Sequence, residues 1–214
     1  MSQVAEKLDQ TTTVSLPHTV TLQALKAALA FAGKKDVRYY LNGVMLEFEL
    51  NRMNIVATDG HTLLLVPVAL DYVPEALVTK QFILDRAGVD ILCKAIPTKV
   101  SVKNPLLHVS TPAPDDNFLT FSSQASMDQH VPLIDGKFPD YRRVIPSLNT
   151  REAPAHAIGV NLTYITRLDK LKPLLTDVNG LKLHPRGANE SMVFIGPIAG
   201  TNQELTAVVM PMRL

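Results

Sequence analysis

Residues 14–33, VSLPHTVTLQALKAALAFAG, join a β-strand candidate directly to an amphipathic helix. The helix is predicted because apolar residues recur at helical spacing. These residues are Leu22, Leu25, Leu29 and Ala32. Thr21 is expected to cap the start of the helix, and Gly33 is expected to follow its last turn. A strand that leads into such a helix predicts an α+β unit, in which the helix covers one face of a sheet.

Two hairpins are predicted after this helix. Asn42-Gly43 and Asp59-Gly60 are two-residue turn signals. Residues with high β-propensity flank each of them, in YYLNGVMLEFEL (39–50) and NIVATDGHTLLLVPV (54–68). The first unit of the chain, residues 15–70, is therefore expected to contain a strand, a helix and further strands.

The same order of elements recurs in residues 71–146 and again in residues 147–214. The second unit is expected to contain a strand at 81–85, a helix at 85–96 and strands at 99–104, 106–111 and 117–125. The third is expected to contain a strand at 156–162, a helix at 163–175, and strands at 181–185, 191–196 and 204–214. Pro173 is expected to shorten or kink the third helix.

The predicted fold is α+β, built from three βαβββ half-modules with curved antiparallel sheets and helices on one face. Two half-modules are expected to pack into one domain, because a single unit cannot bury both faces of its sheet. Residues 15–146 then form a complete domain, and residues 147–214 form a half domain. Residues 1–14 are expected to form a disordered N-terminal tail.

Composition and charge exclude several classes of protein. With 46% hydrophobic and 19% charged residues, the chain is not expected to be disordered. The 21 basic and 20 acidic residues nearly balance, so a DNA partner requires the positive charge to gather on one surface. A single cysteine, Cys93, excludes an internal disulfide and fits a cytoplasmic location. No apolar run reaches the roughly 20 residues of a membrane span.

No catalytic or metal-binding constellation is evident. Asp59 belongs to a turn and His61 starts the return strand, so the two side chains are poorly placed for acid–base chemistry. The six histidines lack metal-ligand spacing, and Gly33-Lys34-Lys35 lacks the upstream glycine of a phosphate-binding loop. Cys93 lies on the apolar stripe of a short helix and has no activating partner. We therefore expect no enzymatic activity and no cofactor, unless distant residues assemble a site.

Two segments carry binding features. A basic and aromatic cluster after the first helix can contact nucleic-acid phosphates and bases, or it can be a solvated helix end with two strand aromatics. Its members are Lys34, Lys35, Arg38, Tyr39 and Tyr40. The methionines of the terminal stretch VVMPMRL (208–214) fit either core filling or an adaptable binding groove.

The stretch DGKFPDYRRVIP (135–146) is a basic and aromatic connector. Asp135-Gly136 marks a turn at its start. Pro139 and Pro146 disfavour a helix, because each removes a backbone donor and restricts the residue before it. An extended segment is therefore expected, which either only links two units or also contributes to a site.

Four stretches together resemble the β subunit of bacterial DNA polymerase III, the sliding clamp, and they occur in the order of that family. They are DVRYYLNGVMLEFE (36–49), VATDGHTLLL (56–65), the connector (135–146) and VVMPMRL (208–214). Residues 15–146 resemble the middle domain of the clamp, and residues 155–214 resemble the second half of its last domain. The resemblance implies the DNA-clamp fold and a role as a processivity factor in DNA replication.

The resemblance also implies a hydrophobic groove that captures linear motifs from DNA polymerases, the clamp loader and repair proteins. The corresponding residues here are Leu41, Thr58, Gly60, His61, Leu63, Pro139, Arg143, Val144, Asn161, Tyr164, Val208, Val209, Met210, Pro211 and Met212. The connector then both links two units and forms part of this groove. Thr62 departs from the family, which usually has a basic residue at this position.

Family clamps bind duplex DNA without sequence specificity, through phosphate contacts on an inner surface lined by helices. The candidates here are Lys26, Lys34, Lys35, Arg38, Tyr39, Tyr40, Arg86, Lys94, Arg167, Lys170 and Lys172. Asp85, Asp90 and Asp169 dilute the positive charge of the second and third helices. The resemblance favours the DNA-binding interpretation of the cluster after the first helix.

The resemblance leaves the assembly and the function open. Rings of this family contain twelve half-modules, so four chains could close a ring and two chains would form an open arc. We therefore expect a homo-oligomer, either a dimer or a tetramer. Three functions remain open. The chain is a compact sliding clamp, or it is a non-encircling peptide-binding module that competes with a full-length clamp, as would suit a phage or mobile element. The third alternative is a structural remnant.

Overall fold

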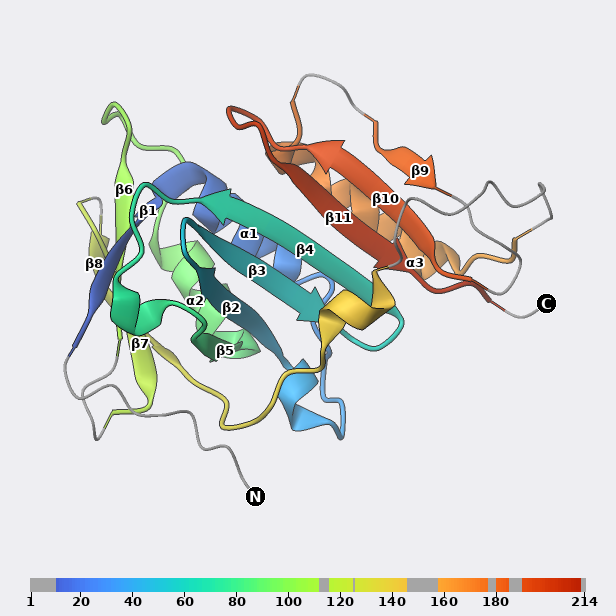
Figure 1. Cartoon of the computed structure of the whole chain (residues 1–214), viewed down its shortest axis with the longest axis horizontal. Helices are drawn as coiled ribbons and strands as arrows, with labels where there is room; N and C mark the ends of the chain where they lie inside the picture. The colour runs from blue at the N-terminus through green and yellow to red at the C-terminus, as the bar shows by residue number, and fades with distance from the viewer. Residues whose placement is uncertain are drawn as a thin grey trace.

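A computed structural model of the chain describes residues 11–111, 116–124, 126–145, 158–176, 180–184 and 190–212. These residues form two antiparallel sheets with helices on one side (Figure 1). Among them, no helix is long and apolar enough to span a bilayer. The prediction of an α+β fold with antiparallel sheets is confirmed.

The elements follow the predicted order in the first two units. The first contains β1 (Thr13–Pro17), α1 (His18–Ala28), the 3-10 turn η1 (Tyr39–Leu41), β2 (Gly43–Glu49), β3 (Arg52–Thr58) and β4 (Thr62–Ala69). The second contains η2 (Glu75–Leu77), β5 (Gln81–Asp85), α2 (Arg86–Ala95), β6 (Leu106–Ser110), β7 (Phe118–Ser123), β8 (Ser126–Pro132) and η3 (Tyr141–Val144). The third contains α3 (Leu162–Arg167), η4 (Leu168–Leu174), β9 (Lys182–His184), β10 (Met192–Pro197) and β11 (Glu204–Val209).

The units exchange strands, which ties them together. One sheet has the order β1-β6-β7-β8, and the other has the order β5-β2-β3-β4-β11-β10-β9. β1 therefore leaves its own unit to pair with β6, and β5 leaves its unit to pair with β2. β11 of the third unit pairs with β4 of the first, with Val208 opposite Leu63. The third unit is thus a direct continuation of the first unit's sheet.

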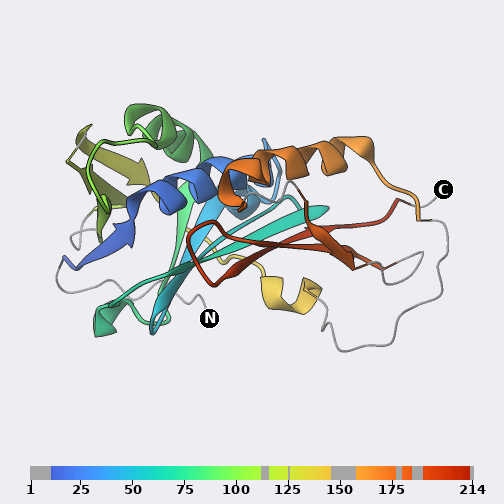
Figure 2. The ribbon, with the colours of Figure 1, turned by 90° about the horizontal axis from the view of Figure 1, so that it is seen from above.

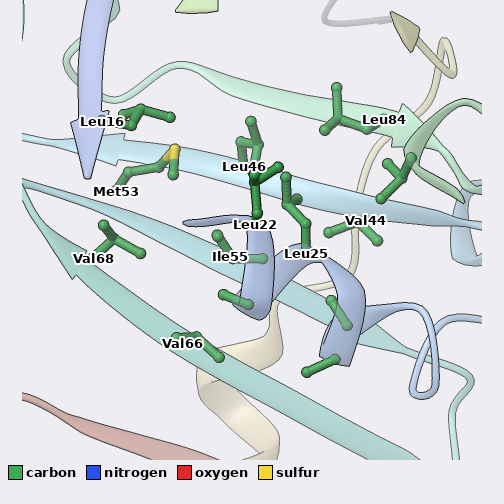
Figure 3. Close-up of a cluster of buried hydrophobic side chains, with 14 of the residues drawn as sticks. Leu16, Leu22, Leu25, Val44, Leu46, Met53, Ile55, Val66, Val68 and Leu84 are labelled. Atoms are coloured by element: carbon green, nitrogen blue, oxygen red, sulfur yellow. The ribbon is translucent and has the colours of Figure 1, made fainter. Parts of the chain in front are cut away.

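Two hydrophobic cores lie on opposite faces of the seven-stranded sheet. The larger core lies between the sheets and the helices, and Figure 3 shows the part where Leu22 and Leu25 of α1 meet Val44, Leu46 and Ile55. Figure 2 shows the three helices on one side of the sheets and η3 on the other. The smaller core lies under the connector and contains Met45, Val56, Leu63, Ile83, Phe138, Tyr141 and Val208.

The predicted ends of the first helix are wrong. α1 begins at His18, directly after Pro17, whose φ of −59° is set by its ring. Thr21 is buried within the helix, so it is not the N-cap. The helix ends at Ala28, and Gly33 lies beyond it, where its N–H donates to the Leu41 carbonyl.

One predicted hairpin is wrong and the other is confirmed. Asn42-Gly43 joins η1 to β2, and the Asn42 side chain exchanges two hydrogen bonds of 2.8 Å with the backbone of Asp36. This amide closes the preceding loop instead of turning a hairpin. Asp59-Gly60 does lie in the turn from β3 to β4, although this loop is longer than the two residues predicted, because Thr58 pairs with Leu63. Gly60 has a φ of +85°, a conformation that favours glycine.

In the second unit, one predicted strand is absent and one observed strand, β8, was not predicted. Residues 99–104 are not a strand, since Asn104 has a φ of 52° and Val102 is 50% exposed. β8 was missed because its sequence, SMDQHVP, lacks the apolar alternation of a half-buried strand.

The connector was expected to be extended, but η3 forms within it because Tyr141–Val144 lie between its two prolines. Pro146 itself lies outside the described residues.

The ends of the chain also differ from expectation. A disordered tail was expected at residues 1–14, but β1 starts at Thr13 and Val14 is buried. Residues 1–10 lie outside the described part of the chain. Of the strand expected at 156–162, residues 156 and 157 are not described, Gly159 forms a single bridge to Met212, and Leu162 already begins α3. The α-helix ends at Arg167 and continues as the 3-10 helix η4, which contains Pro173 and runs to Leu174.

Candidate functional site

The connector is held on the outer face of the seven-stranded sheet by two aromatic side chains. Phe138 and Tyr141 are 5% and 3% exposed, and they pack in the smaller core with Met45, Leu63 and Val208. Burying aromatic rings of this size stabilises the attachment by about 2 kcal/mol each. The same packing leaves Val144 at the surface, 47% exposed.

A buried carboxylate fixes the connector further. The Tyr141 hydroxyl donates to Glu47 at 2.6 Å, and the Arg142 guanidinium donates to both oxygens of Glu47. Asn54 and Gln81 add two more hydrogen bonds. Burial acts to raise the pKa of Glu47, but the hydrogen bonds from Arg142, Tyr141, Gln81 and Asn54 outweigh it and hold the pKa at about 2. Glu47 is therefore ionised and fully partnered at neutral pH.

The tip of the β3–β4 hairpin is shaped by Asp59. One carboxylate oxygen, Oδ1, accepts the N–H groups of His61 and Thr62 at 2.9 and 2.8 Å and the Thr62 hydroxyl at 3.1 Å. The Gly60 N–H donates to the Thr58 hydroxyl. A side chain at Gly60 would meet the guanidinium of Arg38 at 2.9 Å, in addition to the strain of its positive φ. These contacts present His61 at the surface.

α3 lies against this tip. Asn161 caps the helix, because its side chain accepts the Thr163 N–H at 2.9 Å. One turn further, the Tyr164 ring stacks on His61, with the ring centroids 5.6 Å apart and the planes inclined by 16°. The Arg167 guanidinium lies over the Tyr164 ring, 5.1 Å from its centre.

The end of β11 completes the same surface. The Met210 N–H donates to the His61 carbonyl at 2.9 Å, and the Met212 N–H donates to the Gly159 carbonyl at 2.8 Å. Met210 and Met212 are 40% and 45% exposed. Flexible, exposed methionines can adapt to varied apolar side chains.

The structure therefore gathers most of the predicted groove residues, at two levels. Gly60, His61, Pro139, Arg143, Val144, Met210 and Met212 are exposed, and Asn161, Tyr164 and Pro211 are half-buried. The lower set is buried and consists of Leu41, Thr58, Leu63, Val208 and Val209; of these, Leu63 and Val208 pack in the smaller core under the connector. We call the upper set the candidate groove. Among the described residues, no cluster of His, Cys, Asp and Glu could hold a metal ion.

The predicted DNA contacts divide into three groups. Lys26, Lys34, Lys35 and Lys170 are exposed, and Tyr39 is 55% exposed. Arg38, Lys94 and Lys172 are exposed but form ion pairs with Asp36, Asp90 and Asp169. In the third group, Tyr40 packs against the smaller core, and the guanidinium groups of Arg86 and Arg167 bond to partners within the fold.

The two arginines of the third group have internal partners that the sequence does not predict. Arg86 is half-buried, and its guanidinium donates to the carbonyls of Leu29 and Ala32 just after α1, where the helix leaves carbonyls unpaired. Arg167 pairs with Asp59 and is 22% exposed. The sequence places both on helices with basic neighbours, but it does not show these partners.

The Glu47 anchor was missed by the sequence reasoning. Glu47 interrupts an otherwise apolar strand, VMLEFE, and lies on the same face as Met45 and Glu49. A charged residue at such a position needs a partner. The Arg142-Arg143 pair of the connector was the sequence signal that could have identified this partner.

Comparison with known proteins agrees with this arrangement. Residues 16–140 match the family model described as "DNA polymerase III beta subunit, central domain". The chain belongs to the DNA polymerase III β-subunit family. This confirms the resemblance, and it agrees with the expectation that the chain is not an enzyme, since the β sliding clamp is a non-catalytic processivity factor.

Individual relatives give the extent of the similarity. The chain is 32% identical over 143 residues to the β sliding clamp of Haemophilus influenzae, which covers 64% of this chain and 34% of the relative. The solved structure of the Pseudomonas aeruginosa DNA polymerase III subunit β shares the fold, with a TM-score of 0.73, 20% identity and coverage of 100% of this chain and 69% of that one. A P. aeruginosa clamp bound to griselimycin matches with a TM-score of 0.71, 21% identity, and coverage of 100% and 68%. The chain thus spans about a third of the length of the curated relative.

Proposed function

We propose that the chain is a clamp-like processivity factor whose candidate groove binds linear motifs of DNA polymerases, a clamp loader or repair proteins. One observation carries the proposal. Three segments that are distant in the sequence meet at one surface: the β3–β4 tip, the connector, and the α3–β11 region. The family model covers the first two of these segments up to residue 140.

The chemistry of the candidate groove suits a short extended peptide. Val144, Met210 and Met212 offer apolar surface, whereas Asn161, His61 and Arg143 offer a few polar groups that can fix its direction. The buried residues beneath belong to continuous strands and packed cores, so the surface is largely preformed. Preformed sites lose less conformational entropy when a ligand binds.

A fluorescein-labelled peptide that carries a polymerase clamp-binding motif tests this proposal. Its anisotropy is measured while the chain is titrated, and griselimycin is then added as a competitor, because the matched P. aeruginosa clamp was solved bound to it. The proposal expects saturable binding of one peptide per chain and displacement by griselimycin. A peptide that stays unbound at millimolar concentrations of folded chain would contradict it.

We further propose that the chain forms a homo-oligomer, a dimer or a tetramer, and that the tetramer encircles duplex DNA. β9 is an edge strand of the seven-stranded sheet, and an edge strand can pair with a second copy, whereas the outer side of β5 already pairs with Leu133 and Ile134. Exposed Lys26, Lys34, Lys35 and Lys170 can contact phosphates.

A non-encircling peptide-binding module is the second candidate function. It is favoured by the weaker cationic surface, since Arg86 and Arg167 are engaged within the fold and Lys94 and Lys172 are ion-paired. Light scattering with circular DNA separates the two candidates. A clamp is expected to stay on closed circles and to leave when the circle is cut, whereas the module shows no such topological retention.

A further inference from the structure

The contact between Arg167 of α3 and the β3–β4 tip is not explained by DNA binding. Its guanidinium donates to the Asp59 carboxylate at 2.5 Å and to the Thr62 hydroxyl at 2.6 Å. The side chains of Arg167 and Asp59 are 22% and 14% exposed, so this ion pair is largely shielded from solvent. Shielded pairs of this kind fix geometry more strongly than exposed ones.

The two oxygens of Asp59 have different partners. Oδ1 accepts the backbone N–H groups that set the tip, and Oδ2 accepts Arg167. Burial acts to raise the pKa of Asp59, but the Arg167 hydrogen bond and these backbone bonds outweigh it and lower the pKa. The carboxylate therefore remains charged at neutral pH and joins the tip to α3.

Arg167 also touches the aromatic wall of the candidate groove. It lies 5.1 Å from the centre of the Tyr164 ring, which stacks on His61, and the His61 carbonyl accepts the Met210 N–H. The contacts thus run without interruption from Arg167 through Tyr164 and His61 to the end of β11. Displacing the guanidinium removes the cation that holds both the tip and the Tyr164 ring.

We propose that Arg167 is a positioning residue of the candidate groove, which sets the His61–Tyr164 wall through its bonds to Asp59 and Thr62. This inference rests on the proposed peptide-binding function. Thr62 is 2% exposed and stands where the family resemblance leads one to expect a basic residue. In this chain the cation is the Arg167 guanidinium of α3, which donates a hydrogen bond to the Thr62 hydroxyl.

Relocation of the charge gives a sharp test. Arg167→Thr removes the cation, Thr62→Arg adds a second guanidinium beside the first, and the double variant moves the cation from the helix to the hairpin. Each single variant is expected to weaken binding of the fluorescein-labelled polymerase peptide about tenfold, and the double variant is expected to recover most of the loss. Lys103→Thr, at an exposed position in the 99–104 loop that belongs to neither proposed binding surface, is the control and is expected to bind as the wild type does.

Two readouts separate positioning from general stability. Thermal unfolding shows which variants are folded at the temperature of the binding assay. NMR of the free protein follows the His61 ring protons, whose ring-current shift from Tyr164 is expected to fall in Arg167→Thr and to persist in Lys103→Thr. Unchanged peptide affinity and unchanged His61 shifts in a folded Arg167→Thr protein would overturn the inference.

The proposed function itself can fail independently. If the folded wild-type chain binds no peptide, the peptide-binding function is contradicted, whatever the NMR shows. If the wild type binds but the losses in the two single variants simply add in the double variant, the function stands and the charge relocation is wrong.

Discussion

The Glu47 carboxylate and the Arg142 guanidinium form a two-point ion pair, although 95 residues separate them in the sequence. Glu47 lies within β2, and Arg142 lies in η3 of the connector. The pair holds the connector on the outer face of the sheet, next to the position where Val144 reaches the surface. Formation of the candidate groove therefore depends on a contact outside it.

Glu47→Gln is expected to lower the free energy of unfolding by about 2 kcal/mol, because it removes the buried carboxylate of the two-point pair and leaves Arg142 only its contact with Glu49. Urea denaturation measures this change. Glu204→Gln is the matched control, since Glu204 forms only an exposed pair with Lys182 at 3.7 Å, and such pairs contribute little. Equal effects of the two substitutions would contradict the role of Glu47.

The pH dependence of stability provides a second test. Folding lowers the pKa of Glu47 from 4.5 to about 2. The contribution of Glu47 is therefore complete above its unfolded pKa and is lost as the pH falls from about 5 towards 2. Urea midpoints measured between about pH 7 and pH 3 are expected to fall more steeply for the wild type than for Glu47→Gln. Parallel profiles would show that this carboxylate is not the linked group.

The sequence predicted those parts of the fold that depend on local signals. Asp59-Gly60 marks the β3–β4 hairpin correctly, because its turn needs only nearby residues. Asn42-Gly43 carries a similar signal but fails, since the Asn42 side chain bonds to the backbone of Asp36. Propensity does not reveal such a competing contact.

The candidate site was predicted through family resemblance, and its supports were not. The exposed groove residues lie in long motifs that can be matched by position. The partners of Glu47 and Arg167 come from elements 95 and 108 positions away, so only the tertiary structure shows them. The same limitation explains why Arg86 and Arg167 were assigned to DNA.

Val144→Asp is expected to weaken binding of the labelled polymerase peptide by at least about tenfold, because it places a charge on the apolar surface of the candidate groove. The free energy of unfolding is expected to change little, since Val144 is 47% exposed. Val102→Asp introduces the same change at a residue that is 50% exposed in the 99–104 loop. If both variants bind alike, Val144 does not line the peptide site.

Lys34→Glu is expected to weaken retention on DNA several-fold and to reduce the salt dependence of binding by about one unit in the log–log slope. Lys137→Glu makes the same charge change at an exposed position in the connector, which lies on the face opposite the helices (Figure 2). Filter binding at a series of salt concentrations gives both slopes. A larger effect of Lys137→Glu than of Lys34→Glu would contradict DNA binding on the face that carries the helices.

Hydrogen–deuterium exchange with and without the labelled polymerase peptide is the decisive test of peptide binding at the candidate groove, because it reports where the peptide lies without any substitution. We expect slower exchange at the β3–β4 tip, in residues 139–145 and in residues 208–212, with no change in β6–β8. Slower exchange confined to β6–β8, or no change in any peptide segment at saturating ligand, would contradict it.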